Sequence, residues 1–476
     1  MIKNYREPNV YSTVKRKQPR VPATIVDMYP LVIGTGAEDY AFESVTKDYK
    51  IEAITKEVPL TDVTADDEIV SITVFKGADE IKGVTAVKYD VGEGAQAWKA
   101  VLPQETTNNE VLTITVGIAN PDKYTLQRFT GTDAIEEFYG PKHYNGEINK
   151  ISLGAQIACD AGSQVVYVLQ VKNPGKDGDL LEAYKTALDE HVVEIPGNPT
   201  WRLQPVDDNE DVREYLMEFI HTMSSTEERS EKYTALNNSG AAELTTVAAV
   251  TDSFKTFIEK TTARPNKYSA YRCQTFYPNK AVYTFEVVNE DGEKEERDLT
   301  VGGEFIGIAL AGAEQALERE SQSLTCSTIP AYIFKSLKGV KMKRSDKNGL
   351  AAYGVTLLVQ DEENGAITVR DSLSMDVSTE QVADPCITRA VDYGAKYVRA
   401  QLHPYLGKYN INAETISKVQ AAATTAMSTL VSKKLFVTAE VVEIYQNEDD
   451  LTNIIVNARF GVSYPLKTID VNIVCD

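Results

Sequence analysis

The sequence GEFIGIALAGAEQAL, residues 303–317, predicts a helix that lies in the interior of the protein. Small and apolar residues occupy all sides of this segment, so the helix must be buried on most sides. Its apolar run, residues 305–313, is too short to cross a bilayer. The segments before and after it must therefore supply the layers that cover it.

Strand and helix patterns alternate on both sides of this helix. Apolar, β-branched runs predict buried strands at residues 31–33 and 164–171. Amphipathic spacing predicts helices at 132–140, 148–162, 179–192, 209–223, 241–262, 387–406 and 414–434. Hairpins are predicted at 281–301, at 354–373 around Asn364-Gly365, and at 435–464. These patterns indicate a mixed α/β core.

Residues 39–120 have a different pattern. Short alternating or β-branched runs are separated by turn residues, at the spacing of a small sandwich or barrel. With about 150 residues per domain, a chain of 476 residues is expected to hold about three domains. We predict an α+β multidomain protein with an inserted all-β, sandwich-like module and extended terminal arms. The predicted divisions are 1–20, 21–38 with 121–350, 39–120, 351–465 and 466–476.

The composition and motifs give no support for an enzyme. Forty-nine Lys and Arg against 70 Asp and Glu give a net charge of −21, which argues against a general nucleic-acid binder. The four histidines form no metal motif, and the five cysteines form no CxxC pair. The loop Gly34-Thr35-Gly36 resembles a dinucleotide fingerprint, but Asp39 replaces its third glycine. We predict no catalytic residue, no cofactor and no metal, although paired carboxylates leave a hydrolase as an alternative.

The two chain ends look like extended arms. Residues 1–20 are basic and contain two prolines, and residues 466–476 alternate like an unpaired strand. Such a strand exposes backbone donors and acceptors, and it becomes a link when a neighbouring subunit's sheet accepts it. The alternative is a frayed terminus with an edge strand inside the same chain.

A basic island also interrupts this acidic sequence at residues 335–347, and the helix at 387–406 carries further basic residues. Positive charge in a chain of −21 indicates a surface that meets a negative partner. A solvated loop and an ordinary exposed helix face explain the same pattern equally well.

Several segments, in order along the chain, resemble the tail sheath proteins of contractile phage tails and contractile injection systems. The N-terminal PNVYSTV is similar to the family's opening arm, and YTLQRFTGTDAIEEFYGP resembles the stretch that ends in Gly-Pro. AQIACDAGSQVVYVLQV is similar to the family's segment in which a helix is followed by a strand. VGGEFIGIALAGAEQ is similar to the family's glycine- and alanine-rich helix. The run from NGLAAYGVTLLV through ITVRDSL to the two late helices matches best. Residues 39–120 fall outside the resemblance, where sheath proteins carry variable insertions.

The resemblance implies a structural, non-enzymatic subunit that polymerises as stacked hexameric rings around a tail tube. The sheath would contract to drive the tube through the host envelope, with the insertion facing outward and residues 351–465 near the tube. Implied partners are the chain itself, the tube protein, and baseplate and terminator proteins, without direct nucleic-acid binding or membrane insertion. The protein would be assembled in the host cytoplasm and carried in the virion. The alternatives are a non-contractile virion protein, such as a tube or decorated adhesin, and the hydrolase.

The resemblance also assigns roles to individual residues. The inter-subunit arms would include Pro8, Asn9, Val10, Tyr11, Val14, Leu466, Ile469, Val471, Ile473 and Cys475. Cys475 would either form a disulfide with a neighbour or stay a free thiol. The candidate tube-facing basic residues are Lys338, Lys341, Lys343, Arg344, Arg389, Lys396 and Arg399.

Overall fold

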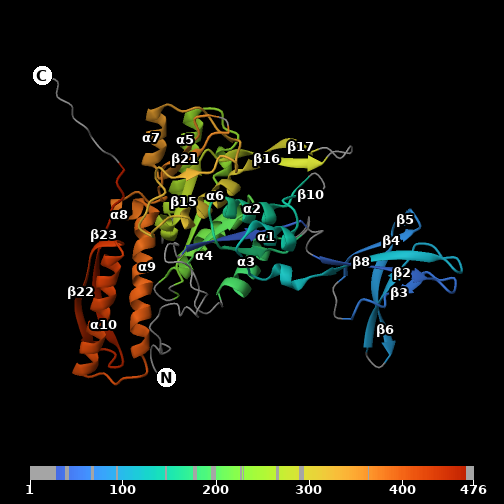
Figure 1. The fold of residues 1–476 in the computed structure, drawn as a ribbon, viewed down its shortest axis with the longest axis horizontal. Coiled ribbons are helices and arrows are strands. Elements are labelled where there is room, and N and C mark those ends of the chain that lie inside the picture. The colour runs from blue at the N-terminus through green and yellow to red at the C-terminus, as the bar shows by residue number, and fades with distance from the viewer. Residues whose placement is uncertain are drawn as a thin grey trace.

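The computed structural model describes residues 28–37, 42–65, 69–92, 95–144, 147–174, 179–193, 200–225, 228, 230–263, 267–288, 294–362 and 364–467. Three regions follow one another along the long axis of the molecule (Figure 1). The strands of residues 42–119 lie at one end, a large sheet with its helices lies in the middle, and residues 385–462 lie at the other end.

A nine-stranded sheet forms the centre of the protein. Its spatial order is β18 (Thr328–Ile329), β21 (Ile367–Asp371), β20 (Val355–Val359), β15 (Cys273–Tyr277), β14 (Lys232–Leu236), β13 (Thr200–Pro205), β1 (Met28–Gly34), β12 (Val166–Gln170) and β9 (Gln127–Phe129). The six strands from β20 to β12 are parallel, and the outer strands run antiparallel to their neighbours. Helices cover both faces of such a sheet, which explains why all of β1 is buried.

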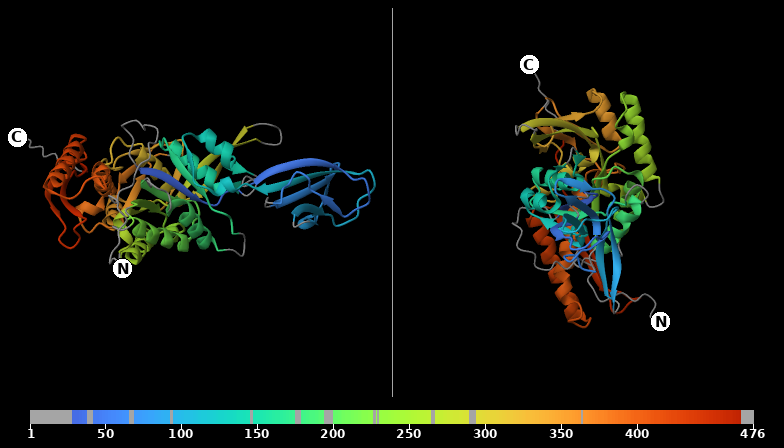
Figure 2. Two further views of the ribbon diagram at one scale, coloured as in Figure 1. Left: turned by 90° about the horizontal axis from the view of Figure 1, so that it is seen from below. Right: turned by 90° about the vertical axis from the view of Figure 1, so that its right-hand side faces the viewer.

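Helices pack on both faces of this main sheet (Figure 2). They are α1 (Thr132–Tyr139), α2 (Lys150–Asp160), α3 (Leu180–Leu188), α4 (Glu210–Met223), α5 (Val247–Thr262), α6 (Gly303–Gln315) and α7 (Arg344–Ala352). Successive side chains of a strand point to opposite faces. Val32 accordingly packs in one apolar cluster with α1, α2 and α6, and Ile33 packs in another with α3 and α4. Helices α5 and α7 share a third cluster with β15 and β20.

The prediction for residues 303–317 is confirmed, because twelve of the thirteen residues of α6 are buried. Its small residues allow close backbone approach to α2. A Cβ added at Gly312 would lie 2.3 Å from the carbonyl oxygen of Ala158, which only glycine avoids. Helix α6 therefore requires the glycine and alanine pattern that marked it in the sequence.

Residues 42–119 follow β1 and precede β9 in the chain, and they form two small sheets. One contains β2 (Phe42–Lys50), β8 (Val111–Ala119), β4 (Ile69–Lys76) and β5 (Asp79–Ile81), and the other contains β3 (Glu57–Pro59), β7 (Ala95–Val101) and β6 (Thr85–Gly92). An apolar cluster of their own, which includes Leu112 and Val74, lies between the sheets. These strands extend away from the main sheet (Figure 2).

All three predicted hairpins are present. Strand β16 (Lys280–Val288) pairs with β17 (Lys294–Gly302) and also with β19 (Ser336–Lys338), and β20 pairs with β21. A two-stranded ladder joins β10 (His143–Tyr144) to β11 (Glu147–Ile148). Gly131 precedes α1 as its N-cap.

The C-terminal unit, residues 385–462, contains α9 (Pro385–Leu402), α10 (Ala413–Ser432), β22 (Phe436–Gln446) and β23 (Ile454–Val462), and the short α8 (Glu380–Ala383) precedes it. It has its own apolar cluster, in which Phe436 stacks on Phe460. The predicted boundary at residue 351 needs correction. Val355 at the start of β20 pairs with Thr275 of β15, so β20 and β21 belong to the main sheet.

Candidate assembly interface

The predicted inter-subunit arms lie mostly outside the described residues. This applies to Pro8, Asn9, Val10, Tyr11, Val14, Ile469, Val471, Ile473 and Cys475. Leu466 is described, and 78% of its surface is exposed. The base of the C-terminal arm, residues 463–467, is thus the part of an arm whose contacts the structure shows.

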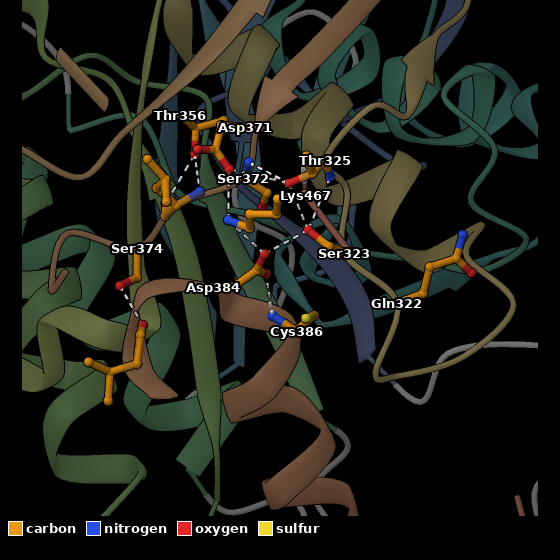
Figure 3. Close-up of polar contacts among 12 residues, drawn as sticks. Gln322, Ser323, Thr325, Thr356, Asp371, Ser372, Ser374, Asp384, Cys386 and Lys467 are labelled. Carbon is orange, nitrogen blue, oxygen red and sulfur yellow. Dashed lines mark hydrogen bonds and ion pairs between the residues drawn. The ribbon is translucent and has the colours of Figure 1, made fainter. Parts of the chain in front are cut away.

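Lys467 ties the base of the C-terminal arm to two carboxylates (Figure 3). Its Nζ lies 2.7 Å from Oδ1 of Asp371 and 3.3 Å from Oδ2 of Asp384. Burial alone would lower the pKa of Lys467, but the charges of Asp384 and Asp371 raise it above its ordinary value. We call these three residues the Lys467 clasp.

The buried member of the clasp, Asp384, also holds two other segments (Figure 3). Its Oδ1 accepts a hydrogen bond of 3.1 Å from the Cys386 N–H, which makes Asp384 the N-cap of α9. Its Oδ2 accepts one of 2.8 Å from Ser323 Oγ, in the segment that follows α6. Asp371 is the last residue of β21. The clasp therefore joins the arm to the main sheet, to α9 and to the segment after α6.

A row of charged side chains on α9 forms the second polar contact between the C-terminal unit and the main sheet. We call Arg389, Asp392, Lys396 and Arg399 the α9 seam. Their spacing of three, four and three residues places them on one face of the helix. The structure turns that face toward the main sheet. Asp392, Lys396 and Arg399 meet partners at the amino-terminal ends of β13, β14 and β15. Arg389 meets its partner at the end of α6.

Arg389 and Asp392 contact buried groups of the core. Arg389 pairs with Glu314 of α6, and its Nε donates a 2.9 Å hydrogen bond to the carbonyl of Glu320. Arg202 of β13 pairs with the same Glu314, and burial together with the charge of Arg389 lowers the pKa of Arg202 to about 9.

Asp392 is held by two partners. It accepts hydrogen bonds from the Tyr233 hydroxyl and from Nη2 of Arg272, the latter at 2.9 Å. Arg272 directly precedes β15, and Tyr233 lies in β14.

Lys396 and Arg399 both pair with Glu231, the residue before β14. The distances from the Glu231 oxygens are 3.0 Å to Lys396 Nζ and 2.9 Å to Arg399 Nη2. Burial alone would raise the pKa of Glu231, but the charges of Lys396 and Arg399 lower it below its ordinary value. The seam is thus a set of buried (Arg389, Asp392) and half-buried (Lys396, Arg399) charges, each paired with a group of opposite charge.

These contacts correct part of the predicted tube-facing set. Arg389 is 3% exposed and fully engaged inside the subunit, so it cannot present a surface charge in this conformation. Lys396 and Arg399 are also directed at Glu231. Lys338, Lys341, Lys343 and Arg344 are exposed around β19 and the start of α7. Nearby Lys335 pairs with Asp298 at 2.6 Å.

The loop after β1 was the only predicted resemblance to a nucleotide site, and the N–H groups of Thr35 and Ala37 in this loop are already used. Thr35 donates from its N–H and from its Oγ1 to Asp207, both at 2.8 Å. Tyr184 and Lys150 also bind Asp207, each at 3.0 Å. The loop therefore presents a buried carboxylate where a pyrophosphate would need free N–H groups.

A hydrolase would require a carboxyl group with a raised pKa, and Glu304, in the first turn of α6, has this property. Burial raises its pKa to about 7, and the charges of Asp207 and Asp208 add to the shift, while Lys150 opposes it. Asn237 Nδ2 lies 3.5 Å from its Oε2. Among the described residues, no group of three His, Cys, Asp or Glu side chains could hold a metal ion.

The buried thiols of Cys273 and Cys386 and the half-buried thiol of Cys159 are poor nucleophiles in this environment, because their pKa values are raised. Burial raises the pKa of Cys159 and of Cys273 to about 12, and that of Cys386 is raised as well. Cys326 is exposed, and Cys475 lies outside the described residues.

Sequence reasoning missed the clasp and assigned three seam residues, Arg389, Lys396 and Arg399, to a tube-facing surface. The clasp joins residues 96 and 83 positions apart, which no local pattern reveals. The seam carried no local signal, because its residues lie on the side of α9 opposite Val398 and the other apolar residues that pack inside the C-terminal unit. A row of charged residues opposite the apolar face of a helix ordinarily faces water.

Comparisons with known proteins give a structural match. No family model matches the sequence, and no curated protein sequence matches it. The helical sheath of the anti-feeding prophage, in its contracted state, matches with a TM-score of 0.53 and 12% identity, over 97% of this chain and 98% of that one. A sheath tail protein from Desulfitobacterium hafniense aligns at 12% identity with a TM-score of 0.42, over 97% and 100% of the two chains.

None of the helices within the described residues combines the length and apolar character that a membrane span requires. The likeness to the anti-feeding prophage sheath extends over almost the whole of both chains. The chain therefore has the fold of a helical sheath protein, in agreement with the resemblance to contractile tail sheath proteins in its sequence.

Proposed function

We propose that this protein is the structural subunit of a contractile tail sheath. Subunits polymerise as stacked hexameric rings around a tail tube, and contraction drives the tube through a host envelope. The observation that carries this proposal is the likeness in fold to the anti-feeding prophage sheath over 97% of this chain. The order of the resembling sequence segments supports it independently.

The C-terminal unit supplies a place where terminal arms could bind. Strands β22 and β23 pair only with each other within the described residues, so each has an open edge there. An extended arm from a neighbouring subunit adds to such an edge by β-augmentation. The outer face carries exposed apolar side chains, which include Val437 and Val442. We assign the two arms, including Pro8 to Val14 and Leu466 to Cys475, to this role between subunits.

The free energy that drives contraction is stored in contacts between subunits. The protein itself is not an enzyme. The loop after β1 binds Asp207, and Glu304 lies beside an asparagine with no histidine among its described contacts. A sheath of this kind changes state through collective repacking of bistable interfaces.

The insertion faces outward and the C-terminal unit lies near the tube. These two regions lie at opposite ends of the long axis (Figure 1), which supports opposite radial positions. Lys338, Lys341, Lys343 and Arg344 remain candidates for contacts with an acidic partner, because all four are exposed. We propose that they contact the tube or a neighbouring subunit through weak, salt-sensitive ion pairs.

Electron microscopy of the purified protein with its tube protein tests the assembly. Full-length protein should form striated cylinders around the tube, and a variant that lacks residues 468–476 should not. This deletion removes the arm beyond its base and keeps Lys467. Cylinders from both proteins would exclude the proposed role of the C-terminal arm, and dispersed full-length protein in the presence of the tube would exclude the sheath.

The basic residues have a separate test. The double variant Lys341→Glu, Lys343→Glu should reduce tube-templated assembly, most clearly at low salt, because surface pairs weaken as ionic strength rises. Lys82→Glu, which reverses an exposed lysine on the outward-facing insertion, is the control. Assembly equal to that of the wild type would show that these residues do not contact the tube.

A further inference from the structure

We propose that Lys467 fixes the point at which the C-terminal arm leaves the subunit, so that force on the arm passes to the main sheet and α9. This inference rests on the proposed sheath function for its purpose, but the anchor itself is a property of the single subunit. It concerns how the arm is attached to its own chain, as distinct from what the arm binds.

The first support is the position of the clasp in the chain. The polypeptide enters the C-terminal unit at Pro385 and completes β23 at Val462. Five residues later, Lys467 contacts Asp384, the residue immediately before that entry. The clasp therefore closes residues 385–467 into a loop whose two ends meet at one place, next to the end of β21 (Figure 3).

The second support is the burial of the group that Lys467 binds. The side chain of Asp384 is 3% exposed, and its other contacts come from neutral donors, the Cys386 N–H and Ser323 Oγ. A buried carboxylate that loses its cation is strongly disfavoured. Among the described residues, Lys467 is the cation that forms an ion pair with Asp384, so the position of the arm is linked to the charge balance of the α9 N-terminus.

The third support is mechanical. Strand β23 pairs only with β22 within the described residues, and a two-stranded sheet has little stability of its own. If the arm continued directly from β23, a pull on it would peel that strand from its partner one hydrogen bond at a time. With the clasp in place, the load reaches Asp371 and Asp384 before it reaches β23.

Leu466 fits this arrangement because it lies beside the anchor and is exposed. Its neighbour Lys467 points inward to the carboxylates, whereas Leu466 is free to meet a second copy of this chain. At the anchor, Lys467 contacts its own subunit, and the neighbouring Leu466 is exposed for contact with a second copy.

Hydrogen exchange of the unassembled full-length protein tests the anchor without any reference to sheath function. Lys467→Met removes the cation and keeps most of the side-chain length. We expect exchange in the peptide spanning residues 454–467 to rise about tenfold, because local opening becomes easier. Lys467→Arg should restore protection, and Lys418→Met, which removes an exposed lysine paired with Glu414, should match the wild type.

Unchanged exchange in Lys467→Met would overturn the anchor. If that variant fails to fold, Asp371→Asn replaces it, because Asp371 is partly exposed and its loss leaves Asp384 paired. The expected rise is then smaller but confined to the same peptide, and no rise would overturn the anchor equally.

Assembly with the tube protein tests the load. Lys467→Met keeps the whole arm, so it should still form cylinders, but these should shorten and break under shear or mild urea sooner than wild-type cylinders. Cylinders of equal resistance would overturn the load-bearing role. Failure of the wild type to assemble would instead reject the proposed function, and the exchange experiment would still decide the anchor.

Discussion

Helices α6 and α9 both contact the centre of the protein, but different interactions hold them in place. Helix α6 lies on a face of the main sheet, and small apolar residues let it approach α2 until backbone atoms touch. Helix α9 lies across the amino-terminal ends of the parallel strands and is held by buried ion pairs. Glu314 belongs to both arrangements, because it ends the apolar run of α6 and pairs with Arg389 of α9.

Because of this difference, the two contacts respond differently to mutation. Apolar packing loses free energy in proportion to the atoms removed or crowded. A buried ion pair loses little when both partners go, but much when one partner stays behind without its counter-charge. The core should therefore tolerate neither added atoms in α6 nor single charge deletions at α9.

The largest expected effect is that of Glu314→Gln. This substitution keeps the shape of the side chain and leaves Arg202 and Arg389 buried without their shared anion. We expect the free energy of unfolding to fall by about 3–5 kcal/mol, measured by urea denaturation. Glu414→Gln, which breaks an exposed pair with Lys418, should leave the unfolding midpoint unchanged. Equal effects of the two variants would refute the importance of burial at the seam.

The next effect depends on pH and concerns Glu304, the carboxylate at the start of α6. It has no ion-pair partner within the described part of the chain, and its pKa is raised from 4.5 to about 7. The folded state therefore keeps a proton that the unfolded state releases as the pH rises from about 4.5 to 7. Stability falls across this window, and the loss is complete above the folded pKa.

Glu304→Gln should remove this pH dependence. Two and a half pKa units correspond to about 3 kcal/mol, so the variant should gain that much over the wild type between pH 4.5 and pH 8. Urea denaturation at both pH values measures the difference. A constant difference between the two proteins would show that Glu304 ionises as freely as an exposed carboxylate.

The sequence predicted α6 well and α9 only in part, for a physical reason. A helix with small apolar residues on every side has one stable environment, so local composition was enough. Arg389 and Arg399 were assigned to a surface because basic side chains are usually solvated. Their partners, Glu314 and Glu231, lie 75 and 168 residues away, and only the folded sheet brings them together.

The same limit applies to the domain boundary. The turn at Asn364-Gly365 and the strands around it were predicted from local residues and are confirmed. That β20 pairs with β15 depends on Thr275 and Val355, which are far apart in sequence. The chain alone therefore indicated the hairpin but not the sheet that it joins.

A smaller effect is expected inside α6. In Gly312→Ala the new Cβ would lie 2.3 Å from the Ala158 carbonyl oxygen and 2.9 Å from the Ala161 Cβ. Because backbone atoms must move, we expect a loss of about 2 kcal/mol in unfolding free energy, measured in urea. A neutral result would mean that α2 and α6 can separate without cost, which would contradict close backbone packing as the basis of this contact.

The smallest effect should have the opposite sign. Gly349 lies inside α7, and a Cβ added there has no atom within 4 Å. Gly349→Ala should therefore raise the free energy of unfolding by about 0.5–1 kcal/mol, because alanine loses less backbone entropy in a helix. The same denaturation experiment measures both glycines. One methyl group should thus destabilise α6 and stabilise α7, because only the space around the helix differs. If both substitutions lowered the free energy of unfolding, the effect would belong to helix geometry, and the packing argument for α6 would lose its support.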